Sequence, residues 1–229
     1  MNQHLSIVRI KAVANVLSSL KDKIVFVGGA TVALYVPKEI TMEVRPTDDV
    51  DIVVEVLSLQ AYYTLENALR AVGFQQDMYS KVICRYQIQG ITVDIMPTTD
   101  ILGFSNLWYP EAFKNAIDVL VDNDMYVKIF PVAYFIASKI EAFKSRGAND
   151  YRTSSDFEDI VYILENRKEI IDDLAATIGE LRNYLKIEFT NFLSNPNIEE
   201  GIYAHIQPHF AAKKTSSIMK LLQKFIEQE

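Results

Sequence analysis

Hydrophobic side chains recur along the chain with two different periods, and the change between them divides the chain into two parts. Up to about residue 130, short alternating or continuous apolar runs indicate strands, interleaved with helices whose apolar positions repeat every three to four residues. Beyond residue 131 only the helical period continues. The pattern therefore predicts a mixed α/β (α+β) domain at residues 1–130 and a C-terminal helical domain at residues 131–229.

Glycine residues mark two of the predicted connections. Gly28-Gly29 follows a short buried strand, and a helix over residues 30–35 is expected to start directly at this pair. Gly90 is expected to form the turn of a hairpin. The strands are predicted over residues 24–27, 50–56, 81–89, 91–96, 117–121 and 126–130. The helices are predicted over residues 5–20, 59–72, 132–146, 154–167, 178–193, 198–205 and 216–226.

The composition describes an ordinary globular chain. Of the 229 residues 49% are hydrophobic and 23% are charged, which allows a sizeable core. No apolar run approaches the about 20 residues of a transmembrane helix, and the N-terminus lacks the apolar stretch of a signal peptide, so we expect a cytoplasmic protein without membrane contact. The single cysteine, Cys84, is interpreted as a half-buried structural thiol, and the three histidines form no cluster with it. Any metal is therefore expected to have carboxylate ligands.

The charge is negative overall but unevenly distributed. A net charge of -7 argues against indiscriminate coating of nucleic acid, because such binding depends on neutralising phosphates. No acidic residue lies between Glu200 and Glu227, whereas four lysines do: Lys213, Lys214, Lys220 and Lys224. This segment is either a solvated helix face or a basic surface for a partner.

Three aspartates carry the candidate chemistry. Side chains alternate along a strand, so Asp49 and Asp51 are expected on one face of their strand, about 7 Å apart at the Cα atoms. By the same alternation, Asp94 opposes its apolar neighbours on a later strand. If the two strands pair, all three carboxylates meet on one surface and form a site for Mg²⁺, with Mn²⁺ as the alternative. Two such ions, about 3.5–4 Å apart, are expected to hold the attacking and leaving oxygens of a displacement.

The glycine turn adds a reason for such a metal to hold a nucleotide. Glycines let phosphates approach the backbone, and the N-terminus of the following helix offers free N–H groups. Taken singly, Gly28-Gly29 is more simply a plain turn, and Asp-x-Asp is common in solvated strands. The order is what is informative: strand, Gly-Gly, helix, Asp-x-Asp strand, and a single aspartate on a later strand.

This order resembles the DNA polymerase beta-like nucleotidyltransferase superfamily, whose signature is a Gly-Gly or Gly-Ser turn, an Asp-x-Asp and a third strand carboxylate. The resemblance covers about residues 24–97 and implies the nucleotidyltransferase fold, a mixed, twisted sheet flanked by helices. It implies that Asp49 and Asp51 bind both metal ions, while Asp94 binds the ion near the attacking hydroxyl and accepts its proton. The implied reaction transfers NMP from a nucleoside triphosphate to an acceptor hydroxyl.

A finer resemblance connects the residues before the acids with the helical half. Arg45 and Thr47, followed later by Lys139, Arg146 and Asp156, are similar to positions in the AbiEii-type toxin nucleotidyltransferases of type IV toxin–antitoxin pairs. The resemblance implies nucleotide contacts at Arg45 and Thr47, triphosphate contacts at Lys139 and Arg146, a catalytic part for Lys139, and a further polar site residue in Asp156. Lys139 and Arg146 are seven residues apart and so share a helix face.

A structural interpretation of these residues stays open beside the functional one. Lys139 or Arg146 could instead form an ion pair with Asp156 or Asp159 and take no part in chemistry. Arg45 could equally be an ordinary surface residue.

The motifs do not determine the acceptor. The toxin-like resemblance implies an RNA end, such as that of transfer RNA, gripped by residues 213–224, and a cognate antitoxin as partner. The overall acidity suits a small hydroxylated molecule or a protein side chain, as in antibiotic-modifying or AMPylating relatives. A third alternative is a catalytically idle nucleotide-binding partner in a toxin–antitoxin pair.

Overall fold

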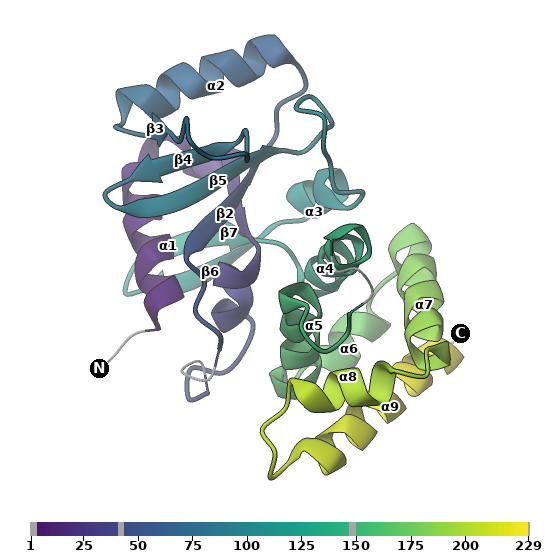
Figure 1. The fold of residues 1–229 in the computed structure, drawn as a ribbon. Helices are drawn as coiled ribbons and strands as arrows, with labels where there is room; N and C mark the ends of the chain where they lie inside the picture. Colours follow the sequence, from purple (N-terminus) through teal and green to yellow (C-terminus); the bar gives the residue numbers. More distant parts are fainter. Residues whose placement is uncertain (1–3, 41–43, 147–149, 229) are drawn as a thin grey trace. The chain divides into compact units, whose positions relative to one another are not determined.

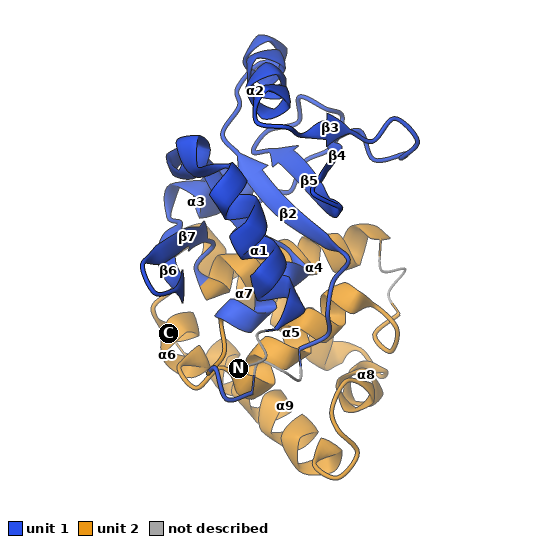
Figure 2. Ribbon diagram, turned by 90° about the vertical axis from the view of Figure 1, so that its left-hand side faces the viewer, with its two compact units in different colours: residues 1–34, 38–131 blue, residues 35–37, 132–229 orange. Residues whose placement is uncertain are grey.

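The chain forms two compact units. Unit 1 comprises residues 1–34 and 38–131, and unit 2 comprises residues 35–37 and 132–229 (Figure 2). The structure, a computed structural model, describes residues 4–40, 44–146 and 150–228; the predicted domains also include residues 1–3, 41–43, 147–149 and 229, which lie outside these ranges. Within the described ranges, no helix has both the length and the apolar character needed to cross a membrane.

Unit 1 consists of a sheet and the helices beside it (Figure 1). Its strands are β1 (Ile24–Val27), β2 (Asp49–Val54), β3 (Gln75–Gln76), β4 (Arg85–Ile88), β5 (Ile91–Pro97), β6 (Ile117–Asp122) and β7 (Met125–Ile129). Its α-helices are α1 (Leu5–Val16), α2 (Leu59–Ala71) and α3 (Tyr109–Lys114). Two 3₁₀ helices, η1 (Ser18–Lys23) and η2 (Gly29–Leu34), flank β1 in the sequence. The architecture of this unit is mixed α/β.

The seven strands form one mixed sheet in the order β3-β4-β5-β2-β1-β7-β6. At its centre β2 pairs in parallel with β5 and antiparallel with β1. The hairpin of β4 and β5 is antiparallel, and β1 pairs in parallel with β7. The strand that carries Asp49 and Asp51 is therefore flanked by the glycine-turn strand on one side and by the Asp94 strand on the other.

Alternation gives the middle of this sheet an apolar face and a polar face. Ile52 and Tyr86 are fully buried on the apolar face. Helix α2 packs on this face, because the hydroxyl of its buried Tyr62 lies 3.4 Å from that of Tyr86. Asp51 and Asp94 sit at the alternate positions of their strands and so project from the opposite face. Burial of the apolar face thereby fixes where the acids point.

Unit 2 contains only helices among its described residues. They are α4 (Val132–Arg146), α5 (Ser155–Asn166), α6 (Ile170–Ala175), α7 (Gly179–Ser194), α8 (Ile198–Ala204) and α9 (Ala211–Glu227). Their core is aromatic: the Phe143 ring lies 4.9, 5.5 and 6.2 Å from the rings of Tyr151, Phe157 and Phe192. Aromatic packing of this kind stabilises the unit beyond the burial of area alone.

Several local structures differ from the predicted ones. The segment after Gly28 is the 3₁₀ helix η2 and not an α-helix, because the carbonyl of Gly28 accepts the N–H of Thr31 three residues on, at 3.1 Å. The strand predicted over residues 81–89 is shorter and begins only at Arg85, because the N–H of Arg85 donates to the carbonyl of Val82 at 3.2 Å and closes a turn there. Helices α3 and α6 had no predicted counterpart.

Candidate active site

The candidate acids form a row across the middle of the sheet. In the parallel register of β2 and β5, Asp51 is the direct partner of Asp94, while Asp49 lies opposite Thr92. Paired strands lie about 4.8 Å apart, so Asp51 and Asp94 are lateral neighbours on the same face. The strand pairing that a shared carboxylate surface requires is therefore present.

Gly28 closes one end of this row. Val27 of β1 pairs with Asp51, so the glycine that follows it lies beside the Asp51 side chain. A Cβ at Gly28 would stand 1.9 Å from Oδ2 of Asp51, and the backbone there has a φ of 69°. Only glycine combines that conformation with so close an approach. Gly29 follows as the first residue of η2 and is buried.

Arg85 of β4 closes the other end of the row, and the sequence analysis missed it. Its register partner is Asp94. The guanidinium donates from Nε to Oδ1 of Asp94 at 2.8 Å and from Nη2 to Oδ2 at 2.8 Å, and Nη2 also donates to Oδ2 of Asp49 at 3.1 Å. The hydrogen bonds to Asp94 raise the pKa of Arg85, and its charge offsets the repulsion between the carboxylates.

The predicted hairpin contained the information needed to place Arg85 beside Asp94. Gln89 and Gly90 both have positive φ, 51° and 77°, as a two-residue turn requires. Counting outward from such a turn pairs residues 88 with 91, 87 with 92, and 85 with 94. A register drawn through Gly90 would therefore have put an arginine opposite the third acid.

Cys84 directly precedes Arg85 in the sequence. It is 2% exposed, so it is fully buried and not half-buried as predicted. Burial raises the pKa of its thiol to about 12, and the thiol is protonated at neutral pH.

The residues ahead of β2 stabilise the start of the acid strand. The hydroxyl of Thr47, which is buried, donates to the backbone carbonyl of Asp49 at 3.0 Å. The Thr47 carbonyl in turn accepts a hydrogen bond from the Arg9 guanidinium. Arg45 lies in the same segment and is partly buried. The observed contacts of Thr47 therefore hold the backbone that carries Asp49.

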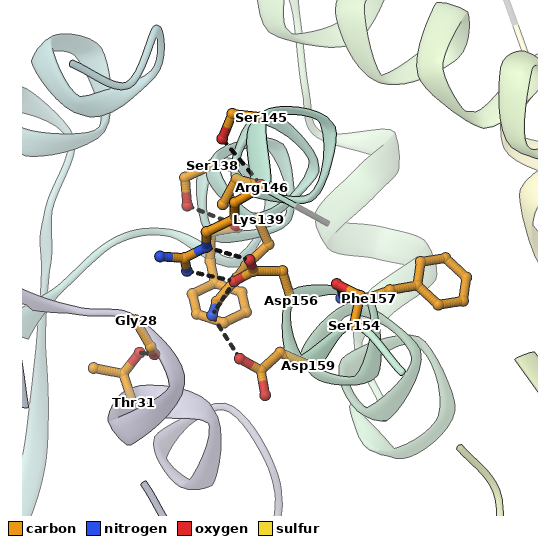
Figure 3. A network of polar contacts seen from close by, with 12 residues as sticks. Gly28, Thr31, Ser138, Lys139, Ser145, Arg146, Ser154, Asp156, Phe157 and Asp159 are labelled. Atoms are coloured by element: carbon orange, nitrogen blue, oxygen red, sulfur yellow. Dashed lines mark hydrogen bonds and ion pairs between the residues drawn. The ribbon is translucent and has the colours of Figure 1, made fainter. Parts of the chain in front are cut away.

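In unit 2, the predicted helical residues form a closed ion-pair network (Figure 3). The ammonium of Lys139 on α4 lies 3.0 Å from Oδ1 of Asp156 and 2.6 Å from Oδ2 of Asp159, both on α5. Arg146 donates to Asp156 from Nε at 2.8 Å and from Nη2 at 2.9 Å. Lys139, Asp156 and Asp159 are 7%, 2% and 4% exposed. Such ion pairs are what the structural interpretation of these residues predicted, and they link helices α4 and α5.

The charges in this network support one another. Burial opposes ionisation of Lys139, but the neighbouring charges of Asp159 and Asp156 outweigh it and raise the pKa of the ammonium. Burial likewise opposes ionisation of Asp156, yet the hydrogen bond from Arg146 and the charge of Lys139 lower the pKa of its carboxyl. Lys139 and Asp156 are therefore both ionised at neutral pH, as a buried ion pair requires.

Helix α9 presents three lysines along one line. Lys213, Lys220 and Lys224 are exposed, and steps of seven and four residues keep them on one helix face. Lys214 lies off this line and forms an ion pair with Glu165. The opposite face of α9 is buried through Ala211, Thr215, Ile218, Leu222 and Phe225. The basic segment is thus an amphipathic helix whose exposed side carries a lysine stripe.

The acids fit a divalent cation by their chemistry, but they do not converge on one in this arrangement. Carboxylate oxygens on adjacent strands are the ligands that Mg²⁺ prefers. Nevertheless, in the described part of the chain no three histidine, cysteine, aspartate or glutamate side chains are grouped so as to hold a metal ion. The contacts give a physical reason, because Asp49 and Asp94 both direct oxygens at Arg85.

Comparison of the chain with protein-family models and with curated protein sequences gives no match. The arguments about function therefore rest on the geometry of the residues themselves.

Proposed function

We propose that this chain is a nucleotidyltransferase of the DNA polymerase beta-like kind, transferring NMP from a nucleoside triphosphate to an acceptor hydroxyl. The observation that carries the proposal is the lateral row of Gly28, Asp51 and Asp94 on one sheet face, with Asp49 two residues along the same strand. The combination of an aspartate in contact with the glycine turn and a second aspartate opposite it on the next strand is more specific for this class of enzyme than either motif alone.

In the proposed reaction, the acceptor oxygen bonds to the α-phosphorus of the triphosphate. The bond from that phosphorus to the oxygen bridging to the β-phosphate breaks, and pyrophosphate leaves with the bonding electrons. Asp94 accepts the proton of the acceptor hydroxyl. Bound Mg²⁺, held by Asp49, Asp51 and Asp94, would supply neutralisation of the phosphate charge. The absence of a side chain at Gly28 lets the Asp51 carboxylate lie directly against the backbone of the turn.

Two further groups of residues belong to the proposal in different ways. Thr47 supports the site indirectly, through the backbone of Asp49. Arg45, Lys139, Arg146 and Asp156 stay candidates for nucleotide contact, and the ion pairs among the last three favour a structural role.

We propose an RNA end as the acceptor, in the manner of an AbiEii-type toxin. The lysine stripe of α9 favours this acceptor, because three exposed ammonium groups on one line can follow a phosphate backbone. A small hydroxylated molecule would make no use of such a stripe.

Label transfer tests the proposed chemistry. The chain is incubated with magnesium, labelled nucleoside triphosphates and total RNA or lysate, and label in macromolecules and small molecules is measured. We expect Asp49→Ala with Asp51→Ala to reduce transfer by at least about 10³-fold, because the acids that position the cations are gone. The matched control replaces two exposed acids of unit 1, Asp100→Ala with Asp124→Ala, and keeps the activity. Transfer that survives the first double substitution excludes this site.

A further inference from the structure

The position of Arg85 bears on how the acid row binds a cation. One guanidinium contacts three carboxylate oxygens, both of Asp94 and one of Asp49. The Arg85 side chain is 27% exposed, and those of Asp94 and Asp49 are 11% and 37% exposed. Partial burial strengthens these bonds relative to those of a fully exposed pair.

A divalent cation and this guanidinium are attracted to the same carboxylates, and their two positive charges repel each other there. Mg²⁺ bonds carboxylate oxygens directly at about 2.0–2.1 Å, which leaves no room for N–H donors along the same lone pairs. Arg85 is charged at every physiological pH, so proton loss cannot release it. Release requires its side chain to rotate away from Asp94 and Asp49.

We infer that Arg85 is a positioning residue of the acid row that competes with divalent cations for the oxygens of Asp49 and Asp94. The inference rests on the proposed function for the identity of the competing cation. In the resting protein Arg85 holds the two carboxylates together. Release of the guanidinium would leave one oxygen of Asp94 available for a cation and the other available to accept the proton.

One consequence concerns what loads the site. A free cation must displace Arg85 using only its bonds to carboxylates, whereas a cation that arrives on a triphosphate also brings phosphate contacts. Arg85 therefore makes the site favour the metal–nucleotide complex over the metal alone, because the complex offsets the lost hydrogen bonds more fully than the metal does.

The experiment measures binding of Mn²⁺ alone to the full chain by electron paramagnetic resonance. We expect Arg85→Gln to bind Mn²⁺ at least roughly tenfold more tightly than the wild type, the change that loss of a charge-assisted hydrogen bond corresponds to. Arg85→Lys, which keeps the charge but loses the planar fork, should fall between them. Arg70→Gln removes an exposed arginine of α2 and should leave the affinity unchanged. Unchanged or weaker Mn²⁺ binding by Arg85→Gln overturns the inference.

A second measurement uses the wild-type chain and needs no folded variant. The ¹⁵N signal of the Arg85 Nε–H group, followed during titration with Mg²⁺, should shift when its hydrogen bond to Asp94 is lost. A signal that stays in place while Mg²⁺ binds, or Mg²⁺ that does not bind, contradicts the exchange.

Tighter Mn²⁺ binding by Arg85→Gln in a chain without label transfer would uphold the competition and refute the proposed reaction. Label transfer with an unchanged Mn²⁺ affinity would do the reverse.

Discussion

Gly28 is the residue whose replacement should disturb the acid row most directly. Gly28→Ala adds a Cβ that would lie 1.9 Å from the Asp51 carboxylate, at a φ of 69°. Gly90→Ala has the same conformational problem, a φ of 77°, but meets nothing within 4 Å. We expect Gly90→Ala to lower the free energy of unfolding by about 1–2 kcal/mol, and Gly28→Ala to lower it by roughly 1–3 kcal/mol more. Urea denaturation of the two variants measures the difference.

The comparison isolates the contact with Asp51. Equal losses for the two alanine variants would mean that Asp51 moves aside freely, and the glycine corner would then have no steric importance.

At the level of single residues, alternation was sufficient to group the acids but not to explain their neighbours. Asp49, Asp51 and Asp94 follow from the period of two, because the apolar side chains between them must face the core. Arg85 also lies in a strand but was not predicted as a site residue, because a lone arginine in a strand has no distinguishing pattern. Only the pairing of residues outward from the Gly90 turn places it opposite Asp94. Ion pairs such as Lys139 with Asp156 were anticipated only as one of two interpretations, because sequence spacing does not say which helix faces which.

The pair of helices α4 and α5 shows how charges can join two elements. Lys139 and Arg146 come from one helix, and Asp156 and Asp159 come from the other. Removing one partner of a buried pair leaves a charge without compensation, which is costly. The stability of unit 2 should therefore depend on the ionisation of Asp156.

Asp156→Asn tests this dependence. The pKa of Asp156 is lowered in the folded chain, so its contribution is present above its ordinary value of 3.8 and is lost as the pH falls through the lower folded value. At pH 7 we expect a loss of about 3 kcal/mol in the free energy of unfolding. The gap between variant and wild type should close as the pH falls below 3.8, as measured by denaturant unfolding at several pH values.

The control for this experiment is Asp172→Asn, an exposed acid of α6. It should change stability little at any of these pH values. A gap for Asp156→Asn that stays constant with pH would show that its carboxylate charge is not what links the helices.

Some elements were predicted to the residue and others were not: α1 ends at Val16 and not at residue 20, and α9 begins at Ala211 and not at residue 216. Helix α4 occupies the predicted residues 132–146 and β1 the predicted residues 24–27, because a strong apolar period leaves few alternatives. The 3₁₀ helix η2 and the short helices α3 and α6 have only a few backbone hydrogen bonds each, so they depend on tertiary packing. The α-helix expected after Gly28 was wrong for this reason, and its dipole cannot be counted toward phosphate binding.

For the molecule as a whole, the proposed RNA acceptor has a testable consequence at the lysine stripe of α9. We expect the triple variant Lys213→Gln, Lys220→Gln and Lys224→Gln to weaken RNA binding. It should also reduce the slope of log affinity against log salt by roughly 2, as loss of three contacts to single-stranded phosphates would. Filter binding over a range of salt concentrations measures both quantities.

An equal change of net charge elsewhere provides the comparison. The exposed lysines Lys21, Lys23 and Lys168, changed together to glutamine, should leave the salt slope near its wild-type value. The same loss in both triple variants would assign the effect to overall charge and would argue against the α9 stripe.

The lateral register of the acid row sets a rule for how this sequence can vary. Asp51 and Asp94 stay on one face only while each keeps its phase relative to the buried residues of its own strand. A single residue inserted into β5 ahead of Asp94 would turn that carboxylate toward the hydrophobic interior, whereas a pair of inserted residues would restore its direction. Length changes inside these strands are thus tolerable in even steps, and the odd ones should be found only in the connecting loops.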